Sequence, residues 1–365
     1  MSGNKIKGRG SQHNIPNRFQ QIHLDNSPEH NNEDQHDNYS GLNENKIPTI
    51  FYNDHSASVL VKNNSPDLGL GYSINPYRGC EHGCIYCYAR PTHEYLGFSA
   101  GLDFETKIMV KRDAPELLQK EFMKKNWIPQ SVFFSGNTDC YQPAERNFQI
   151  TRRCLEVFLK FRNPVSVITK NALILRDMDI LKELSGMNLI RVVISVTTLK
   201  NELQRKLEPR TSSPSMRLKT IEQLSSCGIS TAVNVAPIIP GLTDEEIPSI
   251  LKAASESGAV KAGRVMLRLP YSVKEIFTGW LKNEYPDRAD KIINRIKELH
   301  GDTLYNSNFG TRLTGEGLWA DTIKKIFDTN CAKYGLNKPT SPLSADLFKI
   351  PSDLKNKDQL NLFDF

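Results

Sequence analysis

The sequence contains no long hydrophobic run and few cysteines. No stretch approaches the roughly 20 consecutive apolar residues that a membrane-spanning helix needs, and no apolar core follows the basic N-terminus as it would in a secretory signal. The seven cysteines are too few and too unevenly spaced for a disulfide framework in a chain of 365 residues. These absences argue against a membrane protein and a disulfide-stabilised secreted domain, so we expect a cytoplasmic protein with no membrane partner.

The overall composition is that of an ordinary globular protein, with 38% hydrophobic and 24% charged residues. The formal net charge is +6 at pH 7. A moderately basic body suits an anionic partner such as nucleic acid. A solvated basic surface explains the same charge equally well.

Composition divides the chain into four segments. Residues 1–45 are rich in Asn, Gln, His and Ser and have no sustained periodicity, which predicts a disordered polar arm. Residues 46–270 contain short apolar runs that alternate with amphipathic segments. Residues 271–345 carry only helical patterns, and residues 346–365 form a polar tail with an apolar tip.

The segment 46–270 has the pattern of an α/β fold. The expected strands are Tyr72–Asn75, Ser131–Ser135, Val165–Thr169, Ile190–Val196, Thr231–Ala236 and Arg264–Leu269. Helical patterns lie near 113–125, 145–162, 172–185, 214–227 and 243–257, with three more beyond residue 270 near 272–283, 287–299 and 317–334. Strands that alternate with helices predict a parallel sheet, either flat or curled toward a barrel.

Three of the seven cysteines fall within eight residues. Cys80, Cys84 and Cys87 have the spacing C-x3-C-x2-C, with a glycine before the first and second cysteines that lets the backbone turn closely. Three thiolates on a four-iron cluster leave one iron open to a substrate or cosubstrate. A zinc site with His82 as fourth ligand, or three unrelated buried cysteines, are the alternatives. Structural zinc sites usually pair two knuckles across a longer gap, so the spacing favours a [4Fe–4S] cluster.

This spacing, with an aromatic residue before the third cysteine, resembles the signature of the radical S-adenosylmethionine (radical SAM) superfamily. The resemblance implies a partial (β/α)6 TIM-type barrel and an open iron that binds the amino and carboxylate groups of S-adenosylmethionine. It further implies reductive cleavage to a 5′-deoxyadenosyl radical, an electron donor such as flavodoxin or ferredoxin, and cofactor contacts from Tyr86 and Tyr88, which flank Cys87.

Roughly residues 70–270 resemble one branch, the spore photoproduct lyase-like proteins, and the C-terminal third resembles a bacterial subgroup of unknown substrate. After the second expected strand, Ser135, Gly136 and Thr138 match the segment that holds the amino group of the cosubstrate. Ligands commonly bind at the carboxyl ends of parallel strands in such folds. A simple turn with local hydrogen bonds is the alternative.

Four further residues are expected to bind the cosubstrate, three of them by the same resemblance and Arg210 because of its charge. Lys170 resembles a cosubstrate-binding lysine, Ser195 matches a serine of the ribose region, and Arg210 could meet a carboxylate. The strand exit at Pro237 is expected to lie along the adenine, although a rigid capped turn explains its side chains equally well.

One position departs from the lyase that repairs spore DNA. That lyase has a hydrogen-donating cysteine where this chain has Gly136, so the resemblance does not extend to strict thymine-dimer repair. Cys140 lies nearby, either as a displaced catalytic donor or as a small buried hydrophobe.

The tail carries Gln359, Leu360, Leu362 and Phe363, which resemble the QLxLF peptide that docks bacterial repair proteins on the sliding clamp. Alternatively, these side chains fold back onto the body. The leading hypothesis is a lyase-like radical SAM enzyme that acts on nucleic acid, in DNA repair or modification. The alternatives are a radical SAM enzyme acting on a peptide, protein or small metabolite, and a non-catalytic metal-binding module.

Overall fold

The computed structural model describes residues 5–19, 47–67, 69 and 71–355. Its main sheet has seven strands in the order β10-β9-β8-β7-β6-β3-β2. The six parallel strands, each within a few residues of its predicted position, are β3 (Tyr72–Ile74), β6 (Val132–Phe134), β7 (Val165–Thr169), β8 (Ile190–Ser195), β9 (Thr231–Ile238) and β10 (Lys261–Met266). Strand β2 (Leu60–Lys62) adds an antiparallel edge beside β3.

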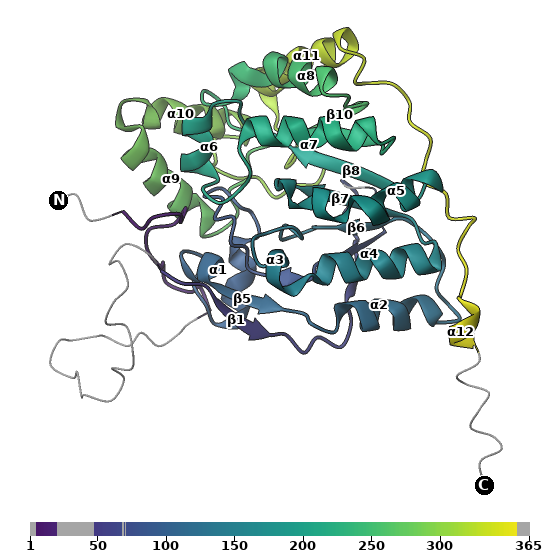
Figure 1. The fold of residues 1–365 in the computed structure, drawn as a ribbon. Helices are drawn as coiled ribbons and strands as arrows, with labels where there is room; N and C mark the ends of the chain where they lie inside the picture. Colours follow the sequence, from purple (N-terminus) through teal and green to yellow (C-terminus); the bar gives the residue numbers. More distant parts are fainter. Residues whose placement is uncertain (1–4, 20–46, 68, 70, 356–365) are drawn as a thin grey trace, which may run out of the picture.

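Helices on the outer face connect the parallel strands, as predicted (Figure 1). They are α2 (Ala114–Met123), α4 (Ile150–Phe161), α5 (Met178–Gly186), α7 (Pro214–Ser226) and α8 (Ile247–Glu256). The edge strands β2 and β10 both line one cavity, so the sheet curls without closing. The α/β architecture is therefore the expected partial (β/α)6 barrel, in which six parallel strands alternate with helices and the two edge strands do not pair with each other.

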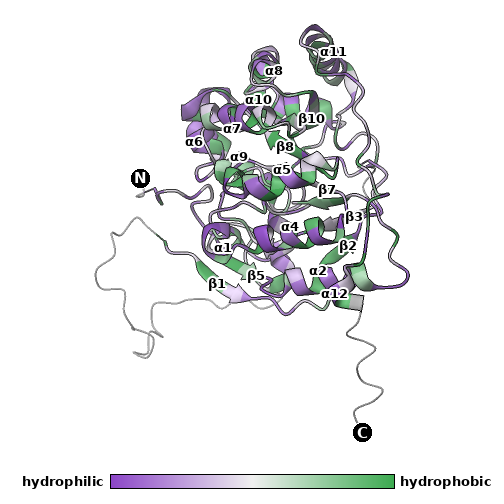
Figure 2. Cartoon of the chain, turned by 45° about the vertical axis from the view of Figure 1, so that its right-hand side comes forward, coloured by the Kyte–Doolittle hydropathy of each residue, from purple (hydrophilic) through white to green (hydrophobic). Residues whose placement is uncertain are grey.

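The main core lies between the sheet and these helices. Its aromatic centre includes Phe122, Phe134 and Phe158, all fully buried. The Phe122 and Phe158 rings meet edge to face, with centroids 5.3 Å apart. Burying each such ring contributes roughly 1.5–3 kcal/mol. Figure 2 shows hydrophobic residues concentrated on the strands and hydrophilic residues on the outer faces of the helices.

A second, three-stranded sheet was not predicted from the sequence. It has the order β1-β5-β4 and contains β1 (Ile50–Asn53), β5 (Lys107–Val110) and β4 (Tyr77–Arg78). Strand β4 has only two residues, and every residue of β1 is exposed. Neither strand shows the alternation that identifies a half-buried strand. This sheet leads directly into the cysteine loop, because Arg78 is followed by Gly79 and Cys80.

The N-terminal segment 5–19 differs from the predicted disordered arm because it packs against the body. Arg9 Nη1 donates a hydrogen bond to Glu105 O (2.7 Å). The backbone N–H groups of Gly10 and Ser11 donate to the Glu105 carboxylate at 2.9 and 2.8 Å. Ile15 is buried in a second core cluster. Polar contacts hold this segment, which apolar periodicity could not reveal. Residues 20–46 of the predicted arm lie outside the described residues.

The C-terminal part is helical, as predicted. It contains α9 (Val273–Glu284), α10 (Pro286–Leu299) and α11 (Gly317–Lys333), and α11 packs against α8. The chain then returns to the barrel, where Phe348 contacts the Phe122 and Phe161 rings, before α12 (Ser352–Lys355). In the described part of the chain, no helix is long and apolar enough to cross a membrane.

Candidate active site

A cavity of about 580 Å³ lies at the carboxyl ends of the parallel strands. The cysteine loop forms one wall, and the exits of β6, β7, β8 and β9 form another. The predicted site residues that line it are Cys80, Cys84, Tyr86, Cys87, Tyr88, Ser135, Gly136, Thr138, Lys170, Ser195 and Pro237. Residues from five separate parts of the sequence therefore meet at the edge of the sheet where ligands bind in such folds.

The cysteine loop needs its two glycines. Gly79 and Gly83 have positive φ angles of 79° and 68°. A Cβ atom at Gly83 would lie 2.7 Å from Glu105 Oε2, and one at Gly79 would lie 2.9 Å from the His93 ring. The loop is thus pressed against buried side chains behind it, and only glycine fits.

All three thiols of the loop are shielded from solvent. Cys80 and Cys84 are buried and Cys87 is half-buried. Burial raises the pKa of each thiol because it disfavours the thiolate, and the Asp139 carboxylate raises the pKa of Cys80 further. A positively charged metal centre would reverse this balance, since metal ligation requires the thiolate.

His82 is engaged elsewhere and does not complete a zinc site. Its ring is buried, with Nδ1 3.4 Å from the Asp139 carboxylate and Nε2 3.2 Å from Asn171 Nδ2. Burial lowers the pKa of His82, with Asp139 opposing, so the ring is neutral and both nitrogens have partners. Among the described residues, no three Cys, His, Asp or Glu side chains converge closely enough to hold a single metal ion.

The turn after β6 combines local hydrogen bonds with exposure to the cavity. Ser135 has a φ of 74°, unusual for a residue other than glycine, and its Oγ accepts a hydrogen bond from Cys140 N (2.9 Å). Thr138 Oγ1 donates to Tyr77 O (2.8 Å), so its lone pairs remain available. Ser135 and Thr138 therefore make the local hydrogen bonds of a simple turn, and they also line the cavity. Backbone strain of this kind often accompanies a binding site.

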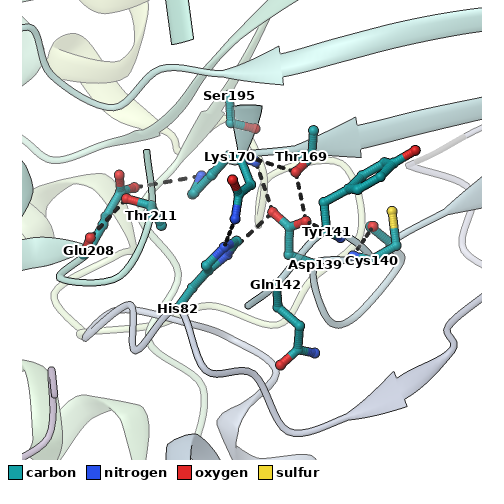
Figure 3. Close-up of polar contacts among 12 residues, drawn as sticks. His82, Asp139, Cys140, Tyr141, Gln142, Thr169, Lys170, Ser195, Glu208 and Thr211 are labelled. Carbon is teal, nitrogen blue, oxygen red and sulfur yellow. Dashed lines mark hydrogen bonds and ion pairs between the residues drawn. The ribbon is translucent and has the colours of Figure 1, made fainter. Parts of the chain in front are cut away.

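Asp139 is a central site residue that the sequence analysis did not select. Its carboxylate accepts hydrogen bonds from Thr169 Oγ1 (2.7 Å), Lys170 N (2.8 Å) and Tyr141 N (2.9 Å), and it faces His82 (Figure 3). It therefore ties the cysteine loop and the exits of β6 and β7 together. A carboxylate directly after a strand exit was the available signal.

Lys170 reaches across the cavity wall from the end of β7. Its Nζ donates to Ala236 O (3.2 Å), lies 3.7 Å from Glu208 Oε1, and is 6.0 Å from the centre of the Tyr86 ring. Ser195 follows on the neighbouring strand β8 and is buried. These contacts hold the lysine ammonium among the strand exits, where an anionic group can reach it.

The sequence analysis also did not select Glu208, although it lies two residues before Arg210. Its fully buried carboxylate accepts hydrogen bonds from Arg217 Nη2, the Tyr86 hydroxyl and Thr197 Oγ1. Burial raises the pKa of Glu208, but the Arg217 guanidinium and the Lys170 ammonium outweigh burial and lower it to about 2. Glu208 is therefore an ionised carboxylate that orients Tyr86 in the cysteine loop.

A sequence model of one protein family, described as "Radical SAM superfamily", matches residues 74–254 of this chain. These residues include the cysteine loop and strands β6 to β9. The chain belongs to the radical SAM superfamily. It is a radical SAM enzyme, and enzymes of this superfamily use a [4Fe–4S] cluster and S-adenosylmethionine.

Three known proteins illustrate what the chain is similar to. An uncharacterised protein of Mycobacterium tuberculosis is 34% identical over 239 residues, or 65% of this chain and 69% of the relative. One from Methanocaldococcus jannaschii is 32% identical over 178 residues, or 49% and 64% of the two chains. A spore photoproduct lyase with bound AdoMet and dinucleoside spore photoproduct has a TM-score of 0.58 at 15% identity, over 80% of each chain. The last likeness shows the fold alone.

Two residues expected in the radical SAM site do not line its cavity. Arg210 pairs instead with Glu81, with Nη1 3.0 Å from Oε1. Cys140 is fully buried in the main core, where burial raises the pKa of its thiol. The burial of Cys140 agrees with the alternative that it is a small buried hydrophobe and not a displaced catalytic donor.

Proposed function

We propose that this radical SAM enzyme generates a 5′-deoxyadenosyl radical in the cavity and acts on nucleic acid, in DNA repair or modification. The observation that carries the proposal is the meeting of three thiols with the strand-exit residues around one cavity. When bound, the cluster and its cosubstrate supply reductive cleavage of S-adenosylmethionine. The chain's residues hold these groups, exclude water and position the substrate.

The donor set fits one four-iron cluster. Cys80, Cys84 and Cys87 would ligate three irons and leave the fourth open. A cluster is larger than a single ion, so its thiolates stand farther apart. This agrees with a loop whose side chains, within the described residues, do not converge on one ion. The commitment of His82 to Asp139 and Asn171 argues against zinc, which needs a fourth ligand.

The strand exits fit the polar groups of the cosubstrate. Lys170 would pair with the carboxylate, and the backbone of Ser135 and Gly136 with the free lone pairs of Thr138 would receive the amino group. Ser195 would face the ribose. The β9 exit at Pro237 would lie along the adenine.

The two tyrosines of the cysteine loop would keep the loop open toward the cosubstrate. The Tyr86 hydroxyl is held by Glu208, and the Tyr88 hydroxyl donates to Gly136 O. Tyr86 therefore ties the loop to Glu208, and Tyr88 ties it to the exit of β6.

Three observations support a nucleic-acid substrate. The net charge is +6, four cationic side chains line the cavity, and the structurally similar lyase binds a dinucleoside spore photoproduct. Because Gly136 and the buried Cys140 provide no cavity thiol beyond the cysteine loop, the target differs from that of the lyase. A peptide, protein or small-metabolite substrate is the alternative.

The decisive experiment measures 5′-deoxyadenosine formation by anaerobically reconstituted, reduced enzyme, with and without single- or double-stranded DNA. We expect one cluster per chain, cosubstrate cleavage, and faster cleavage with DNA. A preparation that binds one zinc and no iron would overturn the cofactor assignment. If no DNA changes the rate of S-adenosylmethionine cleavage and no DNA is itself modified, the proposed substrate class is overturned.

We further propose two protein partners, the bacterial sliding clamp and an electron donor. Residues Gln359, Leu360, Leu362 and Phe363 lie outside the described residues, and clamp docking through them predicts a pulldown that Phe363→Ala abolishes. We propose flavodoxin or ferredoxin as the electron donor and the cytoplasm as the location.

A further inference from the structure

Two cations of the cavity have no hydrogen bond or ion pair within the described residues. Four basic side chains line it. Lys170 is held by Ala236 O and Glu208, and Arg312 pairs with Asp67. Lys62 is exposed, whereas Arg268 is half-buried and its Nε is shielded from solvent without any hydrogen-bond acceptor. A buried guanidinium N–H without an acceptor is uncommon in folded proteins and calls for a partner.

The Arg268 guanidinium is held in place by an aromatic ring. It lies 4.9 Å from the centre of the Tyr88 ring, and the Tyr88 hydroxyl donates to Gly136 O. Tyr88 is the residue after Cys87, so the guanidinium stands beside the cysteine loop. Stacking on an aromatic face orients the flat guanidinium group while leaving its N–H edge free for a ligand.

Arg268 also lies at the seam of the barrel, which we define as the side where the edge strands β2 and β10 face one cavity. The loop 310–313 bridges this seam. Leu313 O accepts from Met266 N (2.9 Å), and Asp67 accepts from Gly310 N (2.7 Å) and from Arg312 Nε. Both Asp67 oxygens thus accept from Gly310 and Arg312, and Arg268 acts on Asp67 only through space, as the last of several causes that lower the pKa of Asp67.

The acidic residues around the cavity give Arg268 no hydrogen bond or ion pair among the described residues. Asp139 is the acidic side chain that lines the cavity in the described part of the chain, and its oxygens are occupied by Thr169, Lys170 and Tyr141. Lys62 ends β2 and Arg268 follows β10 by two residues, so both line the cavity beside the edge strands, which lie farthest from β7 and Lys170 in the sheet order.

We propose that Arg268 binds a phosphate group of the nucleic-acid strand, with Lys62 adding positive charge at the rim. This inference rests on the proposed function. A guanidinium pairs with a phosphate through two parallel N–H donors, whereas an uncharged nucleobase alone would leave the charge of Arg268 unbalanced. Arg268 is thereby a substrate-positioning residue that sets which part of the strand reaches the reacting centre.

The test compares DNA affinity in three variants of the reconstituted enzyme with S-adenosylmethionine bound. The probe is a labelled, mixed-sequence single-stranded 12-mer, followed by fluorescence anisotropy under argon from 25 to 200 mM KCl. Arg268→Gln should bind several-fold more weakly. Its plot of log affinity against log salt concentration should flatten by about 0.7, the value for one lost phosphate contact to a single strand.

Two further variants separate charge from geometry and from fold. Arg268→Lys keeps the charge but loses the flat two-donor edge, so its salt slope should stay while its affinity falls. Arg264→Gln is the matched control, since Arg264 lies on β10, four residues before Arg268, and also stacks on an aromatic ring, Phe327 at 5.6 Å, but does not line the cavity. It should bind DNA like the wild type. Iron content and far-ultraviolet circular dichroism check that each variant is folded.

Each other outcome is decisive. If the wild type binds the 12-mer and both Arg268 variants match it in affinity and slope, this inference is overturned and the proposed function stands. If Arg268→Gln weakens S-adenosylmethionine binding but not DNA binding, Arg268 belongs to the cosubstrate and the inference fails. If the wild type binds an acidic peptide but no DNA, the proposed substrate class fails together with it.

Discussion

Arg90 and Glu105 form a fully buried ion pair behind the cysteine loop, with Arg90 Nη2 2.5 Å from Glu105 Oε1. Arg90 Nε also donates to Cys84 O (3.0 Å), and Glu105 receives the N–H groups of Gly10 and Ser11. The pair thus links the backbone of a cysteine to the N-terminal segment. Its charges are both satisfied, which a buried pair requires.

Removing one partner of this pair should destabilise the protein strongly. We expect Glu105→Ala to lower the free energy of unfolding by about 3–5 kcal/mol, because it leaves the Arg90 charge buried and unpaired. Urea denaturation of the metal-free protein measures this. Glu121→Ala is the control, since it removes a surface pair with Lys124 and should cost at most about 1 kcal/mol. Equal losses in the two variants would contradict the structural role.

A methyl group at Gly10 should displace the cysteine loop. A Cβ atom there would lie 1.8 Å from Gly83 O, a backbone atom that cannot move independently of the loop. We expect Gly10→Ala to lose about 1–3 kcal/mol of stability and to hold less iron after reconstitution. Gly186→Ala in helix α5 is the control, because its Cβ would meet nothing within 4 Å. Normal iron content in Gly10→Ala would show that the N-terminal segment does not support the site.

The cysteines should separate into ligands and core residues. Cys84→Ala should lose the brown colour of the cluster, its iron and 5′-deoxyadenosine production together. Cys140→Ala should keep all three and lose only about 1 kcal/mol of stability, because it removes a small buried side chain. Iron analysis, the visible spectrum and product chromatography measure these effects. Loss of 5′-deoxyadenosine alone in Cys140→Ala would make that thiol catalytic after all.

Glu208 should contribute stability that acid removes. Its pKa is lowered to about 2 in the folded protein from about 4.5 in the unfolded chain, so its contribution is present above about pH 4.5 and is lost as the pH falls toward 2. The full difference corresponds to about 3 kcal/mol. Glu208→Gln should therefore be less stable than the wild type at pH 7, with the gap narrowing at acid pH in urea titrations. A gap that stays constant with pH would exclude this electrostatic role.

The sequence predicts the parts of the fold whose packing is periodic. The six parallel strands alternate or run apolar, and helices such as α4 place Leu155, Phe158 and Phe161 on one face, so their positions could be derived. Strands β1 and β4 and the segment around Arg9 are held by backbone and polar contacts. These leave no periodic signal.

The candidate site was predictable where spacing or strand position carried it. The cysteine loop, Lys170 and Ser195 all lie on the cavity, as expected. Asp139 and Glu208 were not selected because their importance comes from partners distant in sequence. Arg210 does not line the cavity, and its salt bridge to Glu81 could not be derived from the sequence for the same reason.

The cysteine loop is supported by two groups of residues, one translated early and the other about a hundred residues later. The Arg90–Glu105 pair and the N-terminal segment are complete once the first 105 residues exist, whereas Leu207 O, which accepts from Ile85 N, and the Glu208 carboxylate, which holds Tyr86, follow about a hundred residues later. During translation, the cysteine loop would therefore be supported at first only by the Arg90–Glu105 pair and the N-terminal segment. We therefore expect chains that end before helix α6 (Asn201–Leu207) to hold less iron after reconstitution than the full chain, because their three thiols lack these contacts and are open to oxidation.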